Sequence, residues 1–124
     1  MATIELGMLA TELHNVVDEV ASMFGGASSA TVDGDLDCPP GDSGRLIRWQ
    51  YGVRLDAPEG ARENLAYTVL PSMWKMGWQS KDRGNEREFV VQFFRDGAQV
   101  NVHVARTGGD VAIIGSTRCV PTDP

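Results

Sequence analysis

Residues 87–118 of this chain read REFVVQFFRDGAQVNVHVARTGGDVAIIGSTR, and they decide its fold. Apolar and polar residues alternate in three runs, as they do in strands that bury one face. The turn sequences Asp96-Gly97 and Gly108-Gly109-Asp110 separate the runs. Together with a further strand before Arg83-Gly84-Asn85, they predict an antiparallel meander. Its strands are expected at 78–82, 87–95, 98–106 and 110–118.

Working outward from the meander, the N-terminal residues predict an amphipathic helix. From Thr3 to Phe24, apolar residues recur at steps of three and four, which places them on one side of a helix. His14 lies beside this stripe, and Asp18, one turn further on, is expected to pair with it on the surface. Gly25-Gly26 ends the helix.

The middle of the chain predicts a strand followed by a second helix. Residues 46–55 alternate cleanly, with Trp49 on the apolar side. The second helix is expected to start near Asp56, because Asp56 and Glu59 form a variant of the capping box, and Pro71 should kink it.

Residues 27–44 give weaker signals. Residues 27–32 predict a short strand, whereas acidic residues, Gly34 and Pro39-Pro40 favour a loop from Asp33 to Gly44.

These elements predict a single α+β domain over residues 1–124, since 124 residues is the usual size of one domain. We expect a two-layer sandwich with two helices on one face of a mostly antiparallel sheet of five or six strands, ending in the meander. Trp74 and Trp78 are expected to pack in the core, and the alternative for both is an aromatic anchor beside a docking surface. The sheet residues expected to face the helices are Trp49, Tyr51, Val53, Phe89, Val91 and Phe93.

The two cysteines, Cys38 and Cys119, are predicted to form a disulfide. Both fall in expected loops. Reduced cysteines are usually buried in apolar segments, so the loop positions favour a disulfide. They are too far apart for a CxxC redox site, and no histidines cluster with them as zinc ligands. Two unrelated free thiols are the alternative. A disulfide would indicate an oxidising compartment.

Composition and motifs exclude several classes of function. The formal net charge of −6 argues against nucleic-acid binding, which requires a basic surface. Gly41-Asp42-Ser43-Gly44 matches the segment around a serine-protease nucleophile, but the chain is too short for that fold. No nucleophile–base pair, metal site or cofactor motif can be assembled. We therefore expect no catalysis, no metal and no cofactor.

The chain has a recognisable layout: an N-terminal helix, then a Cys in a Gly/Pro-rich loop before a Trp-bearing strand. A second helix follows and leads into a Gly-Trp or Gly-Tyr step and a meander ending in Ser/Thr-x-Cys-Val. The residues that match it are Leu6–Phe24, Cys38-Pro39-Pro40-Gly41, Trp49, Gly77-Trp78 and Ser116-Thr117-Arg118-Cys119-Val120. This layout resembles the mature domains of small exported lipoproteins of unknown function from actinobacteria. The resemblance implies a fold and a compartment but no reaction. The chain departs from it in lacking a signal peptide and a lipid-acceptor cysteine.

No apolar run reaches the ~20 residues of a membrane span, and the sequence from Met1 has no basic or apolar leader. The chain is thus expected to be extracellular or in the cell envelope if a signal was removed, in which case a lipid anchor is possible. It is expected to be cytoplasmic if Met1 is the native start.

Alternation also predicts one binding face, on the side of the sheet away from the helices. A set of polar side chains should gather there, with cations and few carboxylates, in contrast to the acidic chain as a whole. The set is Arg48, Gln50, Arg54, Gln92, Asn101, His103 and Arg118.

We therefore expect a non-catalytic exported or envelope-associated binding domain whose partner is a protein or an acidic polar ligand. The alternative is a cytosolic inhibitor, such as an immunity or anti-defence protein, acting by protein docking. An ordinary solvated sheet face is the simplest reading of the same residues.

Overall fold

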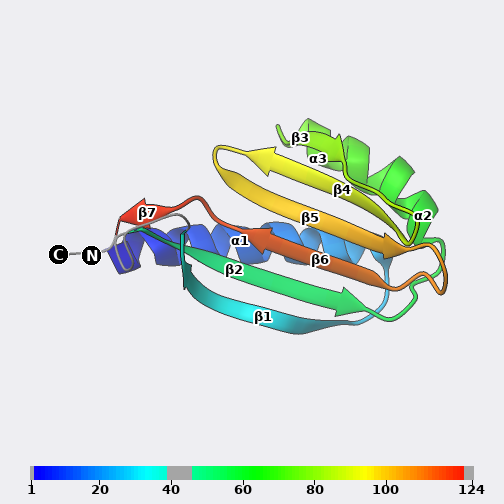
Figure 1. Ribbon diagram of the computed structural model, residues 1–124, viewed down its shortest axis with the longest axis horizontal. Coiled ribbons are helices and arrows are strands. Elements are labelled where there is room, and N and C mark those ends of the chain that lie inside the picture. Colours follow the sequence, from blue (N-terminus) through cyan, green and yellow to red (C-terminus); the bar gives the residue numbers. More distant parts are fainter. Residues whose placement is uncertain (1, 39–45, 122–124) are drawn as a thin grey trace.

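The computed structural model describes residues 2–38 and 46–121, and its centre is one antiparallel sheet (Figure 1). The strand order is β1-β2-β6-β5-β4-β3, and β7 pairs with the start of β2. The strands are β1 (Ser28–Asp37), β2 (Leu46–Leu55), β3 (Gln79–Asp82), β4 (Glu88–Arg95), β5 (Ala98–Ala105), β6 (Val111–Ser116) and β7 (Val120–Pro121).

Helices cover one face of this sheet. Helix α1 (Ala2–Phe24) lies behind it in Figure 1, and no helix of the described chain crosses the face turned to the viewer. The second helical segment consists of α2 (Ala61–Asn64), the π-helical turn η1 (Leu65–Val69) and α3 (Leu70–Lys75). The two-layer α+β sandwich is confirmed, and the described residues form seven strands rather than five or six. Neither α1 nor any shorter helix among the described residues has the length and apolar character needed to cross a membrane.

One apolar core joins the two layers. Val17 and Val20 of α1 and Val69 of η1 are fully buried, as are the inward residues of β5 and β6. Burial of such a side chain stabilises the fold by about 1.5–3 kcal/mol. All six sheet residues expected to face the helices belong to this core or pack against it, which confirms the predicted facing. They are Trp49, Tyr51, Val53, Phe89, Val91 and Phe93.

The meander forms as predicted, because its turn residues suit tight hairpins. Asp96 and Gly97 join β4 to β5 with φ of 51° and 83°, the left-handed conformations of a two-residue hairpin turn. The strands end within two residues of the predicted limits. Of the two tryptophans expected in the core, Trp78 is buried, but Trp74 is exposed and donates its indole N–H to Ser80.

The loop predicted from Asp33 to Gly44 is wrong over its first part. Strand β1 continues to Asp37 and pairs with β2 throughout, from Ser28 opposite Leu55 to Asp37 opposite Ile47. As an edge strand it tolerates acidic residues, which discourage pairing with another chain. The remainder of the predicted loop, from 39 onward, and Gly41-Asp42-Ser43-Gly44 lie outside the described residues.

The second helix begins at Ala61 rather than near Asp56. The segment before it is held in a turn: Ala57 has a φ of 40° and donates its backbone N–H to Asp110. The irregularity expected at Pro71 takes the form of the π-helical turn just before it, since proline cannot donate an i→i−4 hydrogen bond.

Cys38 and Cys119 form a disulfide, as predicted. Asp37 and Val120 both pair with Ile47, one from each side of β2. The neighbouring cysteines therefore tie the edge strand β1 to the C-terminal strand β7 across the end of β2. In the chain-entropy account, closing a loop with a sequence separation of 81 restricts the unfolded chain and stabilises the fold.

Candidate functional site

The helix-free side of the sheet is built from outward positions that alternate with the core. On β5, Val102 points to the core, so its neighbours Asn101 and His103 point outward. Directly opposed residues share a face, and the pairing therefore arranges the outward side chains in three cross-strand rows. The rows are Phe94–Gln99–Ser116–Gln50, Gln92–Asn101–Ile114–Gly52 and Val90–His103–Ala112–Arg54. We call the surface formed by these three rows the open face.

Six of the seven predicted site residues belong to this side of the sheet. Gln50, Arg54, Gln92, Asn101 and His103 occupy the rows of the open face, and Arg48 adjoins them on β2. All but Arg54 are half-buried by their neighbours.

Arg118 does not belong to the open face. It follows β6, and its guanidinium donates to the carboxylate of Glu5 on α1, which packs on the opposite side. Its Cβ also lies where a side chain at Gly97 would be placed. The alternation that put it with the others fails because the strand ends at Ser116.

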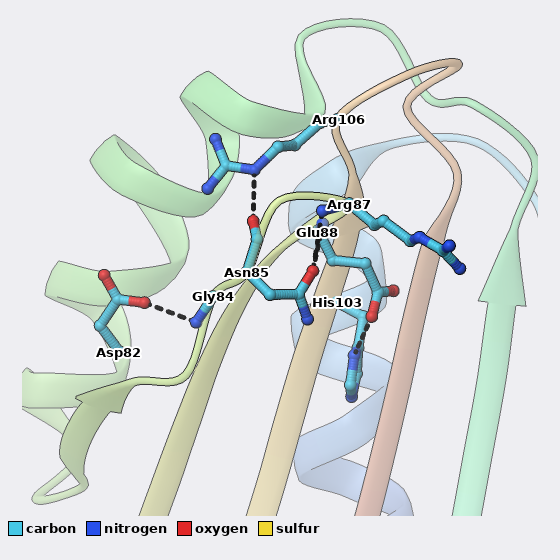
Figure 2. Close-up of polar contacts among 7 residues, drawn as sticks. All are labelled: Asp82, Gly84, Asn85, Arg87, Glu88, His103 and Arg106. Atoms are coloured by element: carbon cyan, nitrogen blue, oxygen red, sulfur yellow. Dashed lines mark hydrogen bonds and ion pairs between the residues drawn. The ribbon is translucent and has the colours of Figure 1, made fainter.

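The prediction of few carboxylates on this face is also wrong. The guanidinium of Arg54 donates to Asp110 at 2.7 Å and lies 3.5 Å from Asp56. The Nδ1 of His103 lies 3.4 Å from the carboxylate of Glu88, a contact drawn in Figure 2. Two of the predicted cations thus have anionic neighbours from the adjacent strand and turns. Because Arg54 and Asp110 are both about half exposed, water screens this pair and it adds little stability.

The position of Glu88 is fixed by the β3–β4 hairpin. In Figure 2 the side-chain oxygen of Asn85 accepts hydrogen bonds from the backbone N–H groups of Arg87 and Glu88. Asp82 similarly accepts from the backbone of Gly84. These short-range bonds hold the hairpin loop, and with it the carboxylate that faces His103.

Amides dominate what remains of the open face. Gln92 donates to Gln99 at 3.1 Å and accepts from the Nε of Arg83 at 3.3 Å. Gln50 and Asn101 lie in the neighbouring rows. The Nε of Arg48 is buried and has no hydrogen-bond partner among the described residues. The surface therefore offers both donors and acceptors, with little net charge.

A second polar cluster lies on the other side of the sheet, between α1, β1 and β2. Asp33 accepts hydrogen bonds from His14 and from the indole of Trp49, each at 2.7 Å. The hydrogen bond from the His14 ring, followed by that from Trp49, lowers the pKa of Asp33 below its usual value. His14 also stacks on the ring of Tyr51 at 3.9 Å.

Tyr51 extends this cluster toward the core. Its hydroxyl donates to Asp18 at 2.7 Å, and burial followed by this bond raises the pKa of Tyr51 to about 12. The predicted pairing of His14 with Asp18 is thus wrong: each bonds to a residue on the sheet. The cluster is best explained as a structural clamp on α1, since its contacts are satisfied within the protein. Recognising β1 as a strand would have revealed it, because Asp33 then faces the helix.

With this geometry defined, the chain can be compared with known proteins. No family model and no curated protein matches it. Two solved structures share its fold. One is LppA of Mycobacterium tuberculosis, which is regarded as a lipoprotein: the identity is 13%, the TM-score 0.63, and the match covers 95% of this chain and 76% of that chain. The other is a DUF4853 family protein from Actinomyces odontolyticus, at 19% identity and a TM-score of 0.63, covering 93% and 66%.

These neighbours define the class at the level of fold: small domains like those of actinobacterial lipoproteins and of families without known function. The resemblance found in the sequence is therefore confirmed for the fold. At these identities the likeness carries no site residues to this chain.

Proposed function

We propose that this chain is a non-catalytic, exported accessory domain that docks a protein partner on its open face. The observation that carries the proposal is the helix-free sheet surface with its rows of amide side chains, Gln50, Gln92, Gln99 and Asn101. Amides can donate and accept, and the broad rows suit another protein surface rather than a small molecule enclosed in a pocket.

The charges of the open face favour a polar partner with both donors and acceptors over a strongly acidic one. Arg54 and His103 already lie beside Asp110 and Glu88, so an acidic partner would have to compete with carboxylates of this chain. Arg48 is the cation of this surface best placed to add an ionic contact.

The absence of catalysis is part of the proposal. The described contacts join His14 to Asp33 and His103 to Glu88, and neither imidazole is bonded to a hydroxyl. Both cysteines are oxidised. An activated nucleophile needs a base within hydrogen-bonding reach, and these contacts provide none.

Export is supported by two observations. Disulfides persist mainly in oxidising compartments, and this chain has one. One of the proteins that share its fold is regarded as a lipoprotein. A cytosolic inhibitor could use the same open face, but its cysteines would be reduced in cells. Thiol alkylation in cells that produce the chain naturally separates these two functions.

The docking surface can be tested by site-specific photo-crosslinking in such cells. A photoreactive residue replaces Asn101 in the centre of the open face or, as control, Tyr67, which is 80% exposed on the helical side. We expect one discrete crosslinked protein from position 101, and none of the same mass from position 67. Adding Gln50→Arg should abolish that crosslink without changing the melting temperature. Equal crosslinking from both positions, or a crosslink insensitive to Gln50→Arg, would refute docking at this face.

A further inference from the structure

Two arginines converge on one aromatic ring at the end of the sheet where β4 begins. The guanidinium carbon of Arg106, just after β5, lies 3.8 Å from the centroid of the Phe89 ring, and that of Arg62, on α2, lies 4.8 Å from the same centroid. The two cations can therefore be no further apart than the sum of these distances. Arg106 is fixed in place because its Nε donates to the backbone oxygen of Asn85 at 2.7 Å (Figure 2).

Among the described residues, no carboxylate lies within ion-pair distance of either guanidinium. Two like charges this near repel each other, by an amount comparable to the ~0.5–1 kcal/mol per cation that the face of a phenylalanine ring contributes at an exposed site. A pair of arginines without a carboxylate neighbour is unusual in a chain with a net charge of −6, which contains many carboxylates. An anion from solution would relieve the repulsion.

The same two side chains line a hollow of about 490 Å³ between α2 and the β5–β6 turn. Gly60, Gly108 and Gly109 form part of its wall, and the space next to each is empty where a side chain would begin. Glu63 is the one carboxylate among its lining residues, and among the described ion pairs it has none with either arginine. The hollow is thus accessible, polar and positively charged.

We propose that this hollow binds a phosphate group. The planar fork of a guanidinium matches two oxygens of an oxyanion, and a tetrahedral phosphate has enough oxygens to engage both arginines at once. Both guanidinium groups contact the Phe89 ring, which keeps them within reach of one ligand at this hollow. The phosphate can belong to a free phosphorylated small molecule or to a lipid headgroup. This site is separate from the open face and does not depend on its function.

The site is tested by titrating the protein with inorganic phosphate while NMR follows the backbone amides, with chloride holding the ionic strength constant. We expect saturable shifts confined to residues around 60–63 and 105–109. Arg62→Gln and Arg106→Gln should each weaken binding at least about tenfold, because each removes a charge-assisted fork. Arg83→Gln is the matched control, since it removes the same charge nearby without touching the hollow, and it should leave binding unchanged.

Three results would overturn the proposal: no binding of phosphate or vesicles, a chloride titration that produces the same shifts, or phosphate binding that survives both substitutions. Arg62 is exposed on a helix, so Arg62→Gln should fold. It therefore tests the site even if Arg106→Gln does not fold. Vesicles with and without an anionic phospholipid distinguish the sources. Vesicle binding lost in Arg62→Gln supports a lipid headgroup, phosphate binding without vesicle binding supports a free phosphorylated molecule, and neither kind of binding contradicts the site.

Discussion

Gly115, the last core-facing residue of β6, allows α1 to approach the sheet, and replacing it tests the packing of the two layers. A Cβ added there would lie 2.6 Å from Cδ1 of Leu13 and 3.0 Å from Cγ2 of Val17. Both are buried residues of α1, at 4% and 0% exposure, so they have little room to move aside. A single methyl group at position 115 should therefore push the helix away from the sheet.

Gly115→Ala should lower the free energy of unfolding by about 1–2 kcal/mol. Overpacking a core costs about 1–3 kcal/mol, and replacing a glycine returns about 0.4–1 kcal/mol by restricting the unfolded chain. The matched control is Gly34→Ala on β1, where an added Cβ meets nothing within 4 Å, and it should be neutral or slightly stabilising. Urea unfolding followed by tryptophan fluorescence measures both.

A double-mutant cycle with Leu13→Ala identifies the cause. Alone, Leu13→Ala should cost about 2–5 kcal/mol through the cavity it leaves. In the double variant the new methyl group occupies part of that cavity, so the loss should be smaller than the sum by at least about 0.5 kcal/mol. If Gly115→Ala is as stable as Gly34→Ala, or if the two losses simply add, the proposed close contact between α1 and β6 is wrong.

Three further predictions concern the disulfide and the clamp on α1. Before reduction, mass spectrometry after alkylation should find no free thiol. Reducing Cys38–Cys119 should lower the free energy of unfolding in urea by about 2–4 kcal/mol without abolishing the fold. The lowered pKa of Asp33 contributes stability that is complete above pH 3.8, the ordinary pKa of the carboxyl group. This stability disappears as the pH falls through the lower pKa of the folded state. Asp33→Asn should therefore flatten the acid side of the profile of stability against pH. The raised pKa of Tyr51 should make stability fall between pH 10.0 and about 12, measured by urea midpoints, and Tyr51→Phe should remove that fall. An unchanged alkaline profile in Tyr51→Phe would mean that this hydroxyl does not titrate differently in the folded state.

The sequence predicts those helices and strands that local residue patterns determine. Alternation around Asp96-Gly97 specified the meander, and the apolar stripe ending at Phe24 specified α1, because both depend on neighbours a few residues apart. Strand β1 was only partly found. Its residues Asp33 and Asp37 are those of a loop by composition, and they are held in a strand by pairing with β2, which no short window contains.

The start of the second helix was missed for a similar reason. Asp56 and Glu59 have the spacing of a cap, yet Ala57 donates to Asp110, 53 positions away, and this bond keeps the segment in a turn. Local capping preference contributes about 1 kcal/mol, which a tertiary contact can override. The disulfide was predictable because both cysteines fall in segments predicted as loops and neither a CxxC nor a zinc arrangement is present.

Long-range contacts of the same kind also determine the charge of the open face. Alternation correctly placed Arg54 and His103 outward, but their carboxylate neighbours come from β4 and from the turn before β6. Asp110 accepts from Arg54 with one oxygen and from the backbone of Ala57 with the other, so Arg54 also helps to hold the chain that leads to α2. Reversing its charge would set a carboxylate against Asp110 and disturb that connection, and a loss of binding would then not identify a docking residue. Gln92 bonds to Arg83 of the β3–β4 hairpin and to Gln99, whereas no hydrogen bond of the Gln50 or Asn101 side chain is found among the described residues. For the proposed docking we therefore expect recognition mainly through Gln50 and Asn101 and their neighbours along the rows.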